Sequence, residues 1–237
     1  MLAVGADVGS PLFWAVFIGW VLSVVLHEFA HGLVAHLGGD YTIRERGGLT
    51  LNPLQYVDPV MSIILPVVFL WMGGVPLPGG VTYVRRDLLR SRAWMSAVSA
   101  AGPAMNFLLF LALAVALHPH AGWVDPTANV TEWTAGQKLV GAMAFLELFS
   151  VLLNLIPIPP LDGFGIISPY LPPRIQEQAT RGPAAFGLFF FLFLLLFVAP
   201  GPTMQAAYTL MGPVADLVGV SLTDLKSAAN LSLYNQP

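Results

Sequence analysis

The sequence predicts an all-α polytopic membrane protein with about four spanning helices, and three observations lead to this fold class. Of the 237 residues, 56% are hydrophobic and only 10% are charged, whereas soluble domains carry roughly 25% charged residues. Long stretches without a charged residue alternate with short segments that carry arginines. Several of these stretches reach the roughly 20 residues that a helix needs to span a bilayer. Lipid is therefore expected to cover much of the apolar surface.

The first predicted span runs from about residue 11 to residue 37 and is expected to end at the glycine pair 38–39, because glycine favours helix termination. The other three spans are expected within 93–124, 139–161 and 183–204. Residues 206–222 are only moderately apolar and predict a C-terminal interfacial helix.

The segment 47–84 does not fit a full crossing. It starts with alternating polarity typical of a strand at 49–54 and continues with about 15 apolar residues broken by prolines and glycine pairs, which is too short to span. Arginines flank this segment on both sides, at Arg44, Arg46, Arg85, Arg86, Arg90 and Arg92. Two more, Arg174 and Arg181, follow the third span. Because basic loops stay in the cytoplasm, both ends of 47–84 are expected there, and the N-terminus and 118–138 outside. The segment is therefore predicted to be re-entrant or β-hairpin-like.

The composition also limits the number of domains, the partners and the metal ligands that can be expected. The chain is expected to form one membrane-embedded domain over 1–237, with its core at 11–170. A net charge of −3 offers no basic face, so nucleic acid is not an expected partner. The chain has no cysteine, which excludes disulfides and thiolate metal ligands.

The first predicted span contains the pattern HEFAH at residues 27–31. His27 and His31 are four residues apart, so they share one helical face and can bind one metal ion. Glu28 is placed to act as a general base toward a water molecule at that metal. Three polar side chains in an apolar helix are costly unless they serve a function. The pattern therefore predicts a zinc metalloprotease.

A third ligand is expected, because catalytic zinc usually has three protein ligands. The candidates near apolar segments are His36, Asp40, Asp58, Glu147 and Asp162. Asp162 follows a proline-broken helix and lies about as far from the predicted cytoplasmic boundary as His31 does. Matched depth therefore favours Asp162 and places the site nearer the cytoplasmic side. The same ligand set also suits Fe(II), which the residues alone leave open.

Three motifs resemble the site-2 protease family of intramembrane zinc metalloproteases: HEFAH, AGPAMNF at 101–107 and NLIPIPPLDG at 154–163. The segment LTLNPLQYVDP is similar to the compact prokaryotic branch that lacks PDZ domains, although Tyr56 stands where a histidine is more common. The resemblance implies one zinc ion, bound by His27, His31 and Asp162, with Glu28 as the base. It further implies that Asn106 and Asn154 lie near the substrate.

The family resemblance implies hydrolysis of peptide bonds in transmembrane segments of other proteins, in the plasma membrane of a prokaryote. A second hypothesis is a membrane metal transporter or a catalytically inactive metal-binding scaffold. A transporter usually has several ligand sites along a path and often an internal repeat, whereas this sequence has one ligand cluster and no repeat. For two residues a structural role is the alternative to a functional one: Asn106 could form a helix–helix hydrogen bond, and Glu147 could pair with another polar group inside the bundle.

Overall fold

The structure is a computed structural model that describes residues 7–56, 82–181, 187 and 200–234. These residues form helices joined by turns, and none of them lies in a strand. The α-helices are α1 (Pro11–Gly38), α2 (Thr42–Glu45), α4 (Arg92–Leu117), α5 (Ala135–Asn154), α6 (Asp162–Ile167), α7 (Pro173–Arg181), α9 (Pro200–Leu217) and α10 (Leu222–Tyr234). Short 3-10 turns are η1 (Pro53–Gln55), η3 (Arg86–Leu88), η4 (Pro119–Ala121), η5 (Val130–Glu132) and η6 (Ser168–Tyr170).

Helix α1 begins and ends where the sequence predicts. Ser10 caps its first turn by accepting a hydrogen bond from the Leu12 N–H at 3.2 Å, and Pro11 needs no N–H partner there. Gly39 closes the helix with φ 121°, a backbone conformation that favours glycine. The 28-residue helix is long enough to cross a bilayer with turns to spare.

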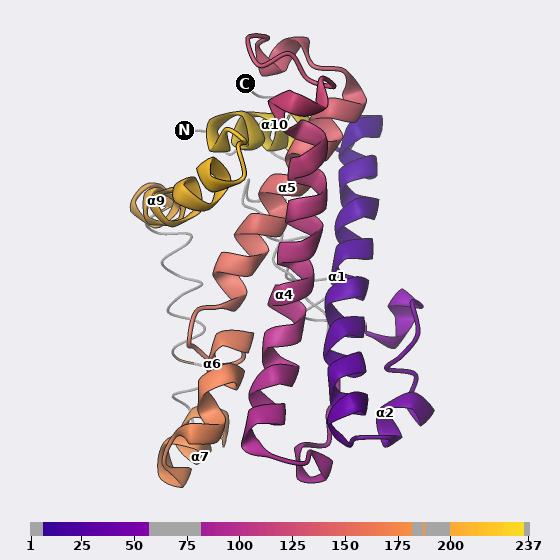
Figure 1. Ribbon diagram of the computed structural model, residues 1–237, viewed down its shortest axis with the longest axis vertical. Helices are drawn as coiled ribbons and strands as arrows, with labels where there is room; N and C mark the ends of the chain where they lie inside the picture. The colour runs from indigo at the N-terminus through magenta and orange to yellow at the C-terminus, as the bar shows by residue number, and fades with distance from the viewer. Residues whose placement is uncertain (1–6, 57–81, 182–186, 188–199, 235–237) are drawn as a thin grey trace.

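Helices α1, α4 and α5 stand side by side and form the body of the molecule (Figure 1). In the part of the chain that the structure describes, these three helices are long and apolar enough to cross a membrane. The bent pair α9 and α10 would make a fourth if it counted as one broken span. Most of the span predicted at 183–204 lies outside the described residues, so it stays a prediction.

The segments that carry the arginines gather at one end of the bundle. Helices α2 and α7 lie at the lower end in Figure 1, whereas the connection from α4 to α5 and helix α10 lie at the upper end. The predicted sidedness is consistent with this arrangement, since it assigns the arginine segments to one side of the membrane and 118–138 to the other. The assignment to cytoplasm and exterior remains a prediction.

The C-terminal part differs from the single interfacial helix that was predicted. It consists of α9 and α10, which meet at an angle of 115°. Helix α10 packs against α5 through Leu225, Ala228 and Leu233, all of them buried. The sequence analysis missed this helix because it mixes polar and apolar residues.

The strand-like pattern at 49–54 does not form a strand. Asn52 accepts a hydrogen bond from the Leu54 N–H at 3.1 Å and caps the 3-10 turn that Pro53 begins. Asparagine followed by proline favours such a turn over an extended strand. The rest of the predicted re-entrant segment, 57–81, lies outside the described residues.

Two apolar clusters frame a polar layer inside the bundle. The larger cluster includes Phe13, Trp20, Phe110 and Phe145, and the smaller one consists of Ala35, Leu89 and Val98 with their neighbours. His27 and His31 lie on α1 between the residues of that helix that enter these clusters. The candidate site is therefore enclosed by apolar packing on both sides.

Candidate metal centre

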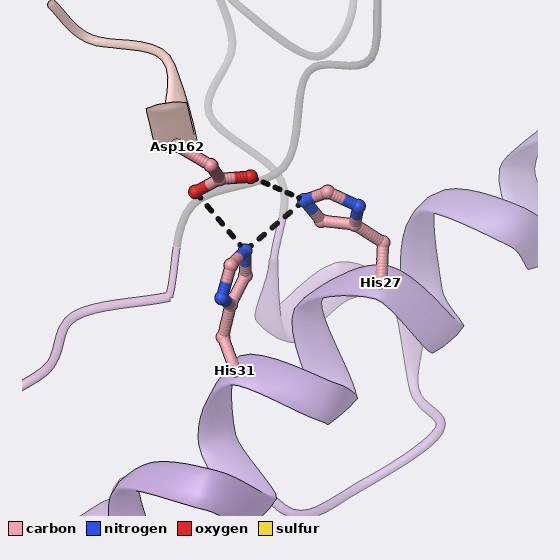
Figure 2. Close-up of side chains that lie close together, drawn as sticks. All are labelled: His27, His31 and Asp162. Carbon is pink, nitrogen blue, oxygen red and sulfur yellow. Dashed lines mark hydrogen bonds and ion pairs between the residues drawn. The ribbon is translucent and has the colours of Figure 1, made fainter. Parts of the chain in front are cut away.

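Two imidazole groups on α1 and one carboxylate converge on a common point (Figure 2). The Nε2 atoms of His27 and His31 are 3.0 Å apart. Asp162 Oδ2 lies 3.1 Å from the first of these nitrogens, and Asp162 Oδ1 lies 3.3 Å from the second. Among the described residues, this is the one group of three His, Asp or Glu side chains arranged to hold a metal ion.

A break in the chain brings Asp162 to this point. Helix α5 ends at Asn154, and Asp162 opens the short helix α6 after the proline-rich turn. The next residue, Gly163, packs so closely on the end of α5 that an added Cβ would lie 2.2 Å from the Leu155 carbonyl oxygen. Glycine at 163 thus allows the chain to fold back and present the carboxylate to α1.

The hydrogen bonds behind the two imidazoles leave their Nε2 lone pairs free. His31 Nδ1 lies 2.6 Å from the Val98 carbonyl oxygen, which can only accept, so the Nδ1–H must donate. His27 Nδ1 contacts Asn106 Oδ1 in the same way. In the neutral state both Nε2 atoms are therefore acceptors, and they face a carboxylate that is also an acceptor.

The donor set and its spacing fit a divalent metal ion. The two imidazole nitrogens and the two carboxylate oxygens, with contacts of 3.0–3.3 Å, repel unless a metal cation or a proton lies among them. Tetrahedral zinc with bonds of about 2.0–2.1 Å requires its ligand atoms to be about 3.3 Å apart. Two histidines and one aspartate thus provide three protein ligands and leave one position for water or substrate, which is the arrangement of catalytic zinc sites.

Helix α4 backs the site through Gly102. A Cβ at this position would lie 2.4 Å from Nε2 of both His27 and His31. Real Cβ atoms do not approach other atoms so closely, so a side chain at 102 would displace both rings. The sequence analysis included Gly102 only as part of the AGPAMNF motif at 101–107.

Asn106 lies behind His27 rather than in an open position. Its Nδ2 donates to Ser23 Oγ at 3.1 Å and to Glu147 Oε2 at 2.7 Å, while its Oδ1 faces His27. The sequence analysis gave a helix–helix hydrogen bond as the structural alternative for Asn106, and such bonds are observed to α1 and α5. The substrate contact suggested for it remains a prediction.

Asn154, the other residue that the resemblance places near substrate, has a different environment. It is buried at the end of α5, and its Nδ2 has no hydrogen-bond partner among the described residues. A buried donor without an acceptor costs about 1–3 kcal/mol. An acceptor such as a carbonyl oxygen would satisfy this donor.

Glu28 lies on α1 next to the ligand His27, and its charge acts on Tyr56. Glu28 is buried and, one residue after His27, is turned about 100° around the helix. The Tyr56 hydroxyl donates to the Thr50 carbonyl oxygen at 2.7 Å. Burial raises the pKa of the Tyr56 phenol, and the charge of Glu28 contributes to this shift. Tyr56 therefore remains a neutral donor that fastens the segment before 57.

Among the described residues, the other third-ligand candidates do not reach the site. His36 packs edge-on against Tyr41, with ring centroids 5.2 Å apart. Glu147 contacts Asn106 and not the metal position. Asp58 lies outside the described residues. The depth argument for Asp162 is therefore consistent with the geometry.

Asp40 is fully buried and serves the fold instead. It accepts hydrogen bonds from the Thr42 hydroxyl, Arg46 Nη2 and the Arg85 N–H. Burial alone would raise the pKa of Asp40, but these bonds and the Arg46 charge outweigh it and hold the pKa below its ordinary value. The contacts join the end of α1 to both sides of the segment 47–84.

The fold and the site together define a helical membrane protein with a metal centre of the metalloprotease type. No model of a known protein family matches the chain, and no solved structure matches it significantly. Curated protein sequences do match the chain. The chain is 38% identical over 202 residues to "Putative zinc metalloprotease Rip2" of Mycolicibacterium smegmatis, an alignment that covers 83% of this chain and 73% of the relative.

Two further relatives agree. The protein of the same name from Mycobacterium tuberculosis is 38% identical over 81% of this chain and 69% of its own length. "Putative zinc metalloprotease YwhC" of Bacillus subtilis is 34% identical over 76% of this chain and 78% of its own length. The chain therefore belongs to the site-2 protease family of zinc metalloproteases.

Proposed function

We propose that this protein is an intramembrane endopeptidase, which hydrolyses peptide bonds within transmembrane segments of other proteins in a prokaryotic plasma membrane. The observation that carries the proposal is the triangle of His27, His31 and Asp162 inside a bundle of apolar helices. His31 is seven residues from the end of α1 at Gly38, which corresponds to about 10 Å along the helix. A peptide bond cleaved there would lie below the membrane surface on the side that carries the arginines.

In this proposal His27, His31 and Asp162 hold one zinc ion, which would supply Lewis acidity toward a water molecule and the scissile carbonyl group. The Glu28 carboxylate accepts a proton from the attacking water and later delivers it to the leaving amine. The angular offset of Glu28 from His27 keeps it out of the ligand set. The products are a new carboxylate and a new amine, so the reaction needs no further reactant.

Asn154 completes the proposed site as a substrate contact. Its unpartnered Nδ2 can donate to a carbonyl oxygen of the substrate. Such a bond forms most readily with a substrate backbone that is not helical, because helical carbonyl groups are already hydrogen-bonded within the helix. The proposed substrates are therefore transmembrane segments that unwind locally.

The test is Glu28→Gln in the purified full chain, reconstituted in lipid with a reporter whose transmembrane segment contains helix-breaking residues. The change keeps the shape and removes the basicity, so cleavage should fall by at least about 10²-fold, while one zinc per chain stays bound. The exposed Glu45→Gln serves as the matched control and should cleave like the wild type.

Metal content separates the alternatives. Asp162→Ala should lose stoichiometric zinc, whereas full zinc occupancy with unchanged affinity would contradict the third-ligand assignment. Glu28→Gln protein that cleaves at near wild-type rate would overturn the catalytic proposal. Zinc flux into vesicles that does not need Glu28 would favour a transporter, and zinc binding without cleavage or flux would favour an inactive scaffold.

A further inference from the structure

We propose that Glu147 is a positioning residue, which fixes the orientation of Asn106 and through it the tautomer of the proposed metal ligand His27. The proposal rests on the metal centre described above and adds a residue on α5 to it. Glu147 acts through Asn106 and makes no direct contact with the metal position.

A continuous chain of buried hydrogen bonds joins Glu147 to His27. Glu147 Oε2 accepts from Asn106 Nδ2 at 2.7 Å, and Asn106 Oδ1 faces His27 Nδ1. Glu147 is 2% exposed, Asn106 is 3% exposed and His27 is 5% exposed, so water does not compete for these bonds. This series of hydrogen bonds connects three helices, from α5 through α4 to α1.

The donors and acceptors in this hydrogen-bond network fix the orientation of the Asn106 amide. An ionised carboxylate can only accept, so it requires the NH₂ group of Asn106 on its side. The amide oxygen of Asn106 must then point toward His27 and requires an N–H there. With its proton on Nδ1, the His27 ring presents the Nε2 lone pair to the metal position.

Without Glu147, the amide of Asn106 could take the opposite orientation. Its NH₂ would then face His27 and favour the tautomer with the proton on Nε2, which cannot bind a metal. Ser23 does not prevent this reversal, because a hydroxyl group can donate or accept. When it is ionised, Glu147 is thus the member of the network that selects one orientation, because only a protonated carboxyl group could also donate.

The position of Glu147 is otherwise hard to explain. A carboxylate in an apolar bundle is costly unless it is paired or serves a function. Among the described residues, no lysine or arginine side chain forms an ion pair with it. Its hydrogen bond to the Asn106 amide instead connects it to the metal centre.

The experiment measures zinc affinity and the visible spectrum of the cobalt(II)-substituted full chain. Loss of an outer-shell partner typically weakens metal binding 10- to 100-fold. Glu147→Leu should show a loss in this range, and its cobalt spectrum should shift toward that of His27→Ala. Leu146→Ala removes a neighbouring buried side chain of α5 and controls for packing, so it should leave affinity and spectrum unchanged.

A double-variant comparison in the Asn106→Asp protein distinguishes an orienting role of Glu147 from a role in packing alone. In Asn106→Asp both side-chain oxygens are acceptors, so no partner is needed to orient the group toward His27. Glu147→Leu should therefore cost less than about threefold in zinc affinity when combined with Asn106→Asp, against the 10- to 100-fold expected alone. Should Glu147→Leu fail to fold, Glu147→Gln in the two backgrounds gives the same comparison with a smaller expected loss.

Two results would overturn the proposal. One is wild-type zinc affinity and an unchanged cobalt spectrum in Glu147→Leu. The other is an equal loss of affinity whether Glu147→Leu is made in the wild-type chain or in the Asn106→Asp background. Neither readout depends on peptide hydrolysis. A chain that binds zinc as predicted but cleaves no reporter would refute the proposed function and leave this inference standing.

Discussion

Gly102→Ala tests how closely α4 backs the ligand pair. The added Cβ would lie 2.4 Å from Nε2 of both His27 and His31 and 2.5 Å from His27 Cε1. The shortest contacts that real Cβ atoms make are near 3.0 Å. The two rings or the α4 backbone must therefore move by at least about 0.6 Å, whereas metal–ligand distances tolerate about 0.2 Å.

The expected magnitude follows from the cost of overpacking, which is typically 1–3 kcal/mol. If this strain falls on the metal-bound state, zinc affinity drops by about 5- to 150-fold, since 1.4 kcal/mol corresponds to a factor of ten. The assay is competition for zinc with a chelator of known affinity, on the purified full chain. The free protein should unfold at a temperature close to that of the wild type, because the rings can rotate away when no metal holds them.

Two matched glycine variants control the experiment. A Cβ at Gly212 meets no atom within 4 Å, so Gly212→Ala should change neither zinc affinity nor stability appreciably. A Cβ at Gly141 would lie 2.8 Å from Ala228 Cβ, away from the metal position, so Gly141→Ala should lower stability without a specific loss of zinc. Wild-type zinc affinity in Gly102→Ala would refute the assignment of the ligand pair to this face of α1.

Three further expectations can be tested on the same protein. Asn154→Leu removes an unpartnered donor, so thermal stability should be unchanged or higher while reporter cleavage falls; a loss of both would argue for a purely structural role. Asp40→Asn should lower the free energy of unfolding by about 1–3 kcal/mol at neutral pH, because the ion pair between the buried Asp40 carboxylate and the exposed Arg46 guanidinium is lost. Because the folded-state pKa of Asp40 lies below its ordinary value, its contribution is present above about pH 4 and disappears on further acidification, so the gap between variant and wild type in chemical denaturation should close there. Single cysteines at Arg44 and Arg86, both exposed, should react with membrane-impermeant reagents only from the cytoplasmic side; labelling from opposite sides would make 59–77 a true span.

The parts of the site that depend on one helix were predictable from sequence. The spacing of His27 and His31 places both rings on one face of α1, and the capping residues set the bounds of that helix. Asp162 was predictable only through its depth relative to His31, because its approach depends on the break between α5 and α6. The prediction of a strand at 49–54 was wrong, because Asn52 and Pro53 favour a turn more strongly than the alternation favours an extended chain.

Helix α10 was missed although a local signal was present. Ser221 is followed three residues later by Asp224, a pattern that often begins a helix, and the Ser221 hydroxyl accepts from the Asp224 N–H at 3.2 Å. The low apolar content of 222–234 argued against a membrane helix. Its packing across the end of α5 depends on tertiary contacts that periodicity does not reveal.

The tautomers of the two histidines show why the rest of the site could not be predicted. His31 is oriented by the carbonyl group of Val98, and every residue has a carbonyl group, so residue type carries no signal for this contact. His27 is oriented by Asn106 and, in our proposal, by Glu147, which is 15 residues from Asp162 in sequence. Along a continuous helix that separation would be about 22 Å. The break after Asn154 brings Asp162 to the proposed metal position, while Glu147 stays behind His27, separated from it by the Asn106 side chain. In our proposal a single interruption of α5 thus supplies both a ligand and the support for another ligand.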